Sequence, residues 1–155
     1  MLVQSRSLTE QPTAVRRAVL AVDQLAEWVP VACSQVAGYL FRRHIAPAGF
    51  AFARYHRLAA GLIGVEAGVP VSTPVRPASL IAASTLPGGA ALSVRYTGPY
   101  DRIGLAYEEI SDWLATEQAL RAGDGWEIYR DLPSCDRLGR RIEIVQPIVF
   151  AHSAV

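Results

Sequence analysis

Hydrophobic and polar residues follow two different periods within the stretch from 86 to 129. Residues 80–98 (LIAASTLPGGAALSVRYTG) give strand material around a Pro-Gly-Gly turn or bulge, and residues 125–132 (GWEIYRDL) have the pattern of a strand. Between them, Gly98 and Pro99 mark a tight corner. Apolar residues then recur at helical spacing, at Ile103, Ala106, Tyr107, Ile110, Trp113 and Leu114. This pattern predicts an amphipathic helix whose apolar stripe is mainly core.

The rest of the chain predicts further strands and one long helix. We expect strands over 13–22, 50–58, 65–71 and 141–150, with fraying up to Glu10. Asp23 is a good N-cap for a helix that ends before Pro47. Pro30 lies inside this helix, so a kink or a new helix start is expected there.

The two halves of the chain repeat the same order of elements. Tyr55 corresponds to Tyr129 at an offset of 74 residues, and Glu66 corresponds to Glu143 at an offset of 77. We therefore predict a single domain, 1–155, with repeats at about 10–71 and 80–150 and a linker at 72–79. The predicted fold class is α+β. Duplicated strand–helix–strand–strand units join edge to edge in an antiparallel sheet, with two main helices on one side and a ligand cleft between the units.

Composition narrows the function classes. The chain has 155 residues, 51% hydrophobic residues and a formal net charge of +1, so neither disorder nor binding to nucleic acid is expected. No apolar run is long enough to span a membrane, and we expect a cytoplasmic protein. Cys33 and Cys135 lack metal-ligand spacing, so we expect inert thiols, no metal and no cofactor, while their redox state stays open.

The candidate chemistry lies on one face of the predicted strands. If Trp126 and Ile128 face the helices, the opposite, concave face carries Glu127, Tyr129, Glu143, Tyr55 and Glu66. Aromatic rings and a carboxylate held in an apolar pocket attract a hydrophobic cation. The alternative is an exposed face on which Glu127 and Glu143 pair with Arg95, Arg130 or Arg141. Strand alternation alone leaves both open.

Five segments carry a resemblance to a known family. They read PAGFAFARYHRL, VEAGVPV, STLPGGAALSVRYTGPYDRIGLAYEEISDWL, GWEIY and RRIEIVQPI. Together, across residues 47–149, they resemble the GyrI-like effector-binding family, the ligand-sensing module of MerR- and AraC-type multidrug regulators. The resemblance implies that Glu127 is the pocket carboxylate, that Glu143 is a second acidic wall residue, and that Tyr55 and Tyr129 are aromatic walls. One departure is Val145, where members often carry an aromatic residue.

Two classes of function follow from the cleft and the resemblance. The first is a stand-alone protein that binds bulky aromatic, cationic compounds through Glu127, with stacking on Tyr55, Tyr129, Tyr96 and Tyr107. The second is a hydrolase of strained electrophilic rings with Glu127 as general base. The expected partner is a small molecule, without direct nucleic-acid or membrane binding. A homodimer and a separate regulator partner are both left open.

Overall fold

The computed structural model describes residues 1–131 and 141–151, which form a curled antiparallel sheet with two main helices. The strands are β1 (Val3–Leu8), β2 (Gln11–Ala21), β3 (Phe52–Arg57), β4 (Leu62–Pro70), β5 (Ala82–Leu86), β6 (Gly89–Thr97), β7 (Ala119–Arg121), β8 (Trp126–Tyr129) and β9 (Arg141–Phe150). The helices are α1 (Leu25–Arg42) and α2 (Gly104–Glu117), with short 3₁₀ turns η1 (Val22–Gln24), η2 (Ala59–Gly61) and η3 (Tyr100–Arg102).

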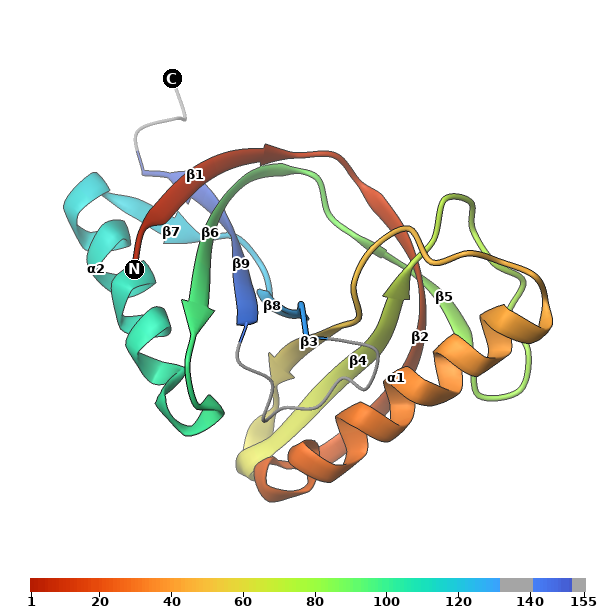
Figure 1. Ribbon diagram of the computed structural model, residues 1–155. Helices are drawn as coiled ribbons and strands as arrows, with labels where there is room; N and C mark the ends of the chain where they lie inside the picture. The colour runs from red at the N-terminus through yellow and green to blue at the C-terminus, as the bar shows by residue number, and fades with distance from the viewer. Residues whose placement is uncertain (132–140, 152–155) are drawn as a thin grey trace.

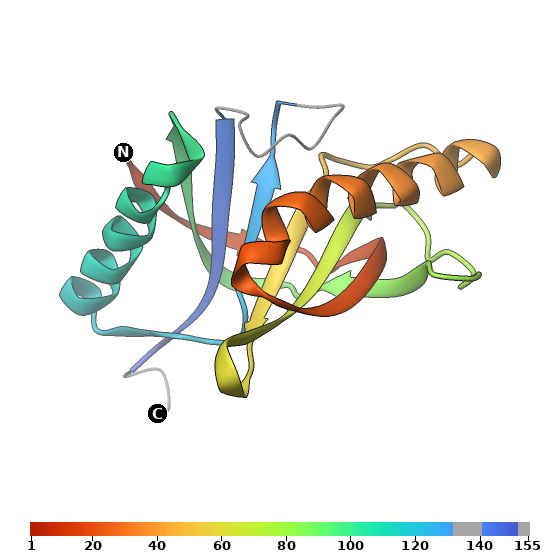
Figure 2. The ribbon, with the colours of Figure 1, turned by 90° about the horizontal axis from the view of Figure 1, so that it is seen from below.

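Two strand–helix–strand–strand units meet in the middle of this sheet. The hydrogen-bonded order is β1-β6-β9-β8-β3-β4-β2-β5, with β7 paired to β9. One unit is β2-α1-β3-β4 and the other is β6-α2-β8-β9, and they join where β3 pairs with β8. The junction lies between the two helices (Figure 1, Figure 2). The predicted fold class is confirmed.

The N-terminal residues form a strand, so the expected fraying up to Glu10 is wrong. β1 pairs antiparallel with β6 along its whole length, from Val3 opposite Val94 to Leu8 opposite Gly89. Strand β1 extends along the edge of the sheet and then leads into β2 (Figure 1). Backbone pairing with β6 holds this polar segment in place, although four of its six residues are exposed.

Helix α1 differs from expectation at its start and at its proline. Asp23 lies in η1, and α1 begins at Leu25, because the Gln24 side chain accepts a hydrogen bond from the Ala21 backbone N–H at 2.8 Å. The helix continues through Pro30 as one element, with no new start. Its buried side chains recur at helical spacing and pack on the sheet: Leu25, Val29, Ala32, Cys33, Val36, Tyr39 and Leu40.

Both helices cover the sheet face that carries Glu127 and Tyr129, and the expectation that they cover the Trp126 face is wrong. Tyr129 and Ile142, which are cross-strand partners, share a buried cluster with α1 residues. Ile144, the cross-strand partner of Glu127, shares a cluster with α2 residues. Residues directly opposite on paired strands point to the same face.

The Trp126 face needs no helix because the sheet curls around it. A second cluster of buried side chains fills the concave side, formed by Val15, Phe52, Leu86, Ala91, Trp126 and Val145. These residues come from strands at both ends and in the middle of the sheet. The curl therefore buries this apolar face against itself. Glu127 and Tyr129 lie on the other face, which the helices cover.

Candidate functional site

Glu127 is buried and held by three tyrosine hydroxyls. Its residue surface is only 3% exposed. Tyr107 donates to Oε2 at 2.6 Å, while Tyr100 and Tyr129 donate to Oε1 at 2.9 and 3.1 Å. Tyr55 and Tyr129 have their hydroxyls 2.9 Å apart, which connects a fourth tyrosine to the network. We call Glu127 with Tyr55, Tyr100, Tyr107 and Tyr129 the tyrosine cluster.

The strand register explains why this cluster has a single carboxylate. Glu127 on β8 stands directly opposite Ala53 on β3, at the junction of the two units. The offset of 74 that relates Tyr55 to Tyr129 also relates Ala53 to Glu127. Of the three residue pairs between β3 and β8, this is the one that joins equivalent positions of the two units. Because one of them is alanine, the carboxylate has no acidic neighbour at its equivalent position.

The cluster joins the sheet to elements on both sides of the junction. Tyr129 is buried among residues of α1, including Cys33. Tyr100 comes from η3 and Tyr107 from α2, where their seven-residue separation places them on one side of a helical segment. Tyr107 leaves 37% of its surface exposed even though its hydroxyl contacts Glu127.

No basic side chain neutralises Glu127. Among the described residues, no arginine or histidine nitrogen lies within 4.0 Å of its carboxylate. Burial raises the pKa of Glu127 above the ordinary value of 4.5, and the hydrogen bonds from Tyr107 and Tyr129 only partly oppose that increase. Burial, together with the nearby Glu127, also raises the pKa of Tyr107 and Tyr129, so both phenols stay protonated and can donate.

Glu143 lies on the opposite face, so its predicted place beside Glu127 is wrong. In the register Glu127 faces Ile144, while Glu143 faces Ile128. Glu143 is 4% exposed and accepts hydrogen bonds from Arg6 Nη1 and Arg130 Nη1, each at 2.9 Å. Pairing with arginine, the alternative for both glutamates, therefore holds for Glu143 and fails for Glu127.

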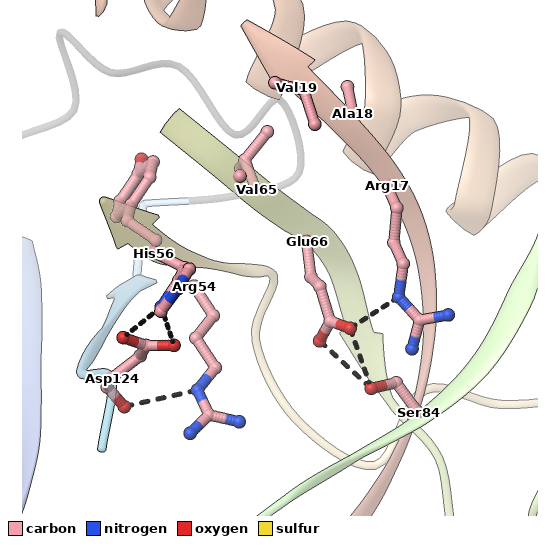
Figure 3. Close-up of a pocket in the computed structure, with 11 residues that line it drawn as sticks. Arg17, Ala18, Val19, Arg54, His56, Val65, Glu66, Ser84 and Asp124 are labelled. Atoms are coloured by element: carbon pink, nitrogen blue, oxygen red, sulfur yellow. Dashed lines mark hydrogen bonds and ion pairs between the residues drawn. The ribbon is translucent and has the colours of Figure 1, made fainter. Parts of the chain in front are cut away.

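Glu66 also lies on the face opposite Glu127. It stands across from Arg54 and Arg17 on the neighbouring strands and accepts from Arg17 Nε at 2.7 Å and from Ser84 at 3.0 Å. These groups line a cavity of about 530 Å³ in which His56 contacts Asp124 (Figure 3). The prediction that Glu66 shares a face with Glu127 is therefore wrong. As for Glu143, the strand register places Glu66 on the Trp126 face.

Two further predicted residues have distinct positions. Tyr96 is buried among residues that pack with α2, and its hydroxyl donates to the Pro99 carbonyl. Its hydroxyl is therefore engaged outside the tyrosine cluster. Cys33 is buried, with its thiol 3.8 Å from the Phe52 carbonyl oxygen, while Cys135 falls outside the described residues.

Tyr100 is the functional candidate that sequence reasoning missed. It precedes the predicted helix, so it fell outside the apolar stripe that began at Ile103. Its spacing of seven from Tyr107 was the available signal. Within 1–131 and 141–151, no group of three or more His, Cys, Asp or Glu residues is arranged to hold a metal ion. No helix in these segments is long and apolar enough to cross a membrane.

Sequence comparison decides the family. The sequence profile of the GyrI-like small molecule binding domain matches residues 32–138, which is more than half of the chain. The chain belongs to the GyrI-like family. A search of curated proteins found no match. The GyrI-like domain here thus has the fold that its sequence predicted, with the tyrosine cluster at the junction of its two units.

Several solved structures share this fold. The C-terminal domain of EcmrR has a TM-score of 0.75 at 19% identity, covering 97% of this chain and 98% of that one. EcmrR in a complex with DNA has a TM-score of 0.78 at 18% identity, and this chain spans 58% of its length. SAV2435 bound to tetraphenylphosphonium has a TM-score of 0.67 at 12% identity, covering 96% and 94%. At these identities the likeness shows the fold.

Proposed function

We propose that this GyrI-like domain binds bulky aromatic cations at the tyrosine cluster. The observation that carries the proposal is Glu127, a buried carboxylate with phenol donors and no basic partner among the described residues. An ionised carboxylate without a countercharge is costly in an apolar setting. A ligand cation removes part of that cost on binding, so the site favours positive charge.

Glu143 and Glu127 are both buried but have different partners. Both glutamates are almost fully buried, on opposite faces of adjacent strands. Glu143 has two arginine partners and so already has its countercharge. Glu127 is surrounded by neutral phenols, whose rings also offer faces to a cation. Each such ring contributes about 0.5–2 kcal/mol to cation binding. The aromatic character of the ligand follows from the same rings.

A ligand cation meets a carboxylate that already has hydrogen-bond partners. Both Glu127 oxygens already accept hydrogen bonds, from Tyr107 on one oxygen and from Tyr100 and Tyr129 on the other. Tyr129 is buried in the sheet, whereas Tyr107 is partly exposed on α2. We infer that a cation displaces Tyr107 from Oε2, or lies against the ring faces while Tyr107 keeps its bond.

Relatives support both the ligand class and the biological role. SAV2435 was solved with tetraphenylphosphonium, an aromatic cation, and EcmrR was solved in a complex with DNA. We propose that this domain senses or sequesters ligands of that class, either as a homodimer or in association with a separate regulator. This domain spans 58% of the EcmrR chain, so the proposal covers ligand binding and leaves out the remaining activity of a whole regulator.

A hydrolase is the second candidate, because the same carboxylate has the properties of a general base. The raised pKa of Glu127 brings it closer to neutral pH, and the protonated Tyr107 lies 2.6 Å from it. In this reading Glu127 removes a proton from water while the water oxygen bonds to a ring carbon. The bond between that carbon and the ring heteroatom breaks, and the heteroatom takes the proton of the Tyr107 hydroxyl. Glu127 then returns the proton it took from water to Tyr107 across their 2.6 Å contact. A hydrolase from Listeria innocua has the same fold, with a TM-score of 0.63 at 10% identity.

One experiment separates the two candidates. Thermal shift and titration calorimetry are run with aromatic cations, neutral analogues and strained-ring electrophiles, on the wild type and Glu127→Gln, with mass spectrometry of the recovered ligand. Cation-selective binding that Glu127→Gln weakens, with the ligand recovered intact, supports a receptor. Consumption of an electrophile that stops in Glu127→Gln supports the hydrolase. Binding indifferent to Glu127 refutes both.

A further inference from the structure

A second cavity opens on the concave face of the sheet, the face opposite Glu127. Its volume is about 370 Å³, within the usual range for small-molecule sites. Most of its wall is apolar, with large contributions from Leu8, Phe50, Phe52, Leu86, Trp126 and Ile128. Phe52 and Trp126 are buried beneath it, whereas Phe50 is exposed at its side. Such a surface suits the body of a hydrophobic ligand.

The polar part of this cavity has more positive than negative charge. Glu143 is shared between Arg6 and Arg130, through one Nη1 atom of each. One carboxylate thus meets two guanidinium groups, and Arg95 stands opposite Glu143 in the register of β6 and β9. The other guanidinium N–H groups of Arg6 and Arg130 make no hydrogen bond to the described residues.

The Arg130 guanidinium is held in place from two sides. Its Cζ atom lies 5.0 Å from the centre of the Phe50 ring, and its Nη1 atom bonds to Glu143. Glu143 in turn is fixed because it is buried and bound at both oxygens. A guanidinium that is already positioned loses little side-chain entropy when its remaining N–H groups bind an anion.

We infer that this cavity is a second ligand site, for hydrophobic organic monoanions such as medium-chain carboxylates. The ligand carboxylate bonds to the open N–H groups of Arg6 and Arg130, and its apolar body lies against Phe50, Phe52 and Trp126. The cavity has a net charge of +1 without the ligand, so a monoanion neutralises it. This site differs from the tyrosine cluster in sheet face and in the sign of the charge it selects.

The first unit provides a matched control. Glu66, the counterpart of Glu143, is paired with one arginine, Arg17, and lines the other cavity (Figure 3). That cavity also contains the Asp124 carboxylate beside His56, and its lining does not include Phe50, Phe52 or Trp126. The exchange of Arg17 and Glu66 for glutamine therefore changes an equivalent ion pair without touching the proposed anion site.

The test is titration calorimetry with octanoate, octylammonium and 1-octanol, which share one alkyl chain and differ in charge. Octanoate should bind saturably, one per chain, and more tightly than the other two. Glu143→Gln keeps an oxygen that can accept from a guanidinium, and the Phe50 ring still packs on Arg130. It removes the one negative charge near the ligand carboxylate, so it should increase octanoate affinity by about tenfold. Arg130→Gln added to Glu143→Gln should reverse that gain. Glu127→Gln and the Arg17→Gln/Glu66→Gln pair should leave octanoate affinity unchanged.

Three results would overturn the anion site: no saturable octanoate binding to the wild type, equal binding of octanoate and 1-octanol, or octanoate affinity that falls in Glu143→Gln. The comparison of the three ligands needs only the wild type, so it remains decisive even if a variant does not fold. The proposed cation site has a different face and different residues, so either proposal can fail while the other stands.

Discussion

The hydroxyls of Tyr55 and Tyr129 lie 2.9 Å apart, although the two residues belong to different units of the fold and are 74 positions apart in the sequence. The two units join where β3 pairs with β8, with Ala53 directly opposite Glu127. Tyr55 and Tyr129 each follow two residues later on their own strand, on the same face, and their side chains meet. Tyr129 then donates to Glu127, so both units contribute to the setting of one carboxylate. The duplicated fold thus creates the candidate site directly.

Replacement of Glu127 by glutamine should stabilise the domain at neutral pH. Burial raises the pKa of Glu127 above 4.5 in the folded protein. Between that ordinary value and the raised one, the folded state binds more protons than the unfolded chain, so the free energy of unfolding falls as the pH rises. Glu127→Gln avoids this loss and should gain about 1–2 kcal/mol at pH 7.5, the order of an uncompensated buried polar group.

Denaturant titration at several pH values measures this effect. The gain in Glu127→Gln should shrink to nothing as the pH falls below about 4.5, where the glutamate is protonated in both states. Glu143→Gln is the control, because its carboxylate has two arginine partners and its loss should destabilise by about 1–3 kcal/mol. Destabilisation by both variants at neutral pH would contradict the assignment of Glu127 as an uncompensated charge.

Removal of the Tyr107 hydroxyl should make cation binding require a higher pH. Tyr107 donates to Oε2 of Glu127 at 2.6 Å and so favours the ionised carboxylate. A hydrogen bond to a charged group contributes about 1.5–3 kcal/mol. Tyr107→Phe should therefore move the midpoint of pH-dependent binding upward by about one to two pH units. Fluorescence titration of an aromatic cation across pH measures this midpoint.

Tyr96→Phe is the matched control for that variant. Its hydroxyl donates to the Pro99 carbonyl, whereas the hydroxyls that bond to Glu127 come from Tyr100, Tyr107 and Tyr129. The midpoint should stay where it is in the wild type. Equal midpoints for Tyr107→Phe and the wild type would show that the phenol does not set the charge state of Glu127.

Gly68→Ala should be severely destabilising because β2 and β4 approach closely there. A Cβ atom at Gly68 would lie 1.9 Å from the Ala14 carbonyl oxygen, which is backbone and cannot move aside. The expected loss is about 3 kcal/mol or more in the free energy of unfolding. Gly104→Ala is the comparison, since nothing lies within 4 Å of its Cβ position. It should cost nothing and gain up to about 1 kcal/mol in α2.

Alternation within each strand predicted the local faces correctly. Glu127 and Tyr129 share a face, and Trp126 and Ile128 share the other, as the period of two requires. Alternation does not predict which residues of neighbouring strands share a face, because that depends on the strand register. Glu127 stands opposite Ile144 and not Glu143, and a shift of one residue would exchange every face.

The curl of the sheet explains the other error. Trp126 and Ile128 were expected to face the helices. In the curled sheet they pack against Val15 and Leu86 from distant strands. Nothing in the local pattern of residues indicates that curvature. The curvature follows from pairing between strands that are distant in the sequence. Because the curl buries the Trp126 face, the helices pack on the Glu127 face instead.

The most direct test of the central claim is calorimetry with tetraphenylphosphonium and its neutral analogue triphenylphosphine oxide at pH 7.5. The wild type should prefer the cation, and Glu127→Gln should weaken cation binding by about ten- to a hundredfold, as expected for the loss of one partly buried countercharge. Binding of triphenylphosphine oxide should change little. Cation affinity that is the same in the wild type and Glu127→Gln would contradict the account.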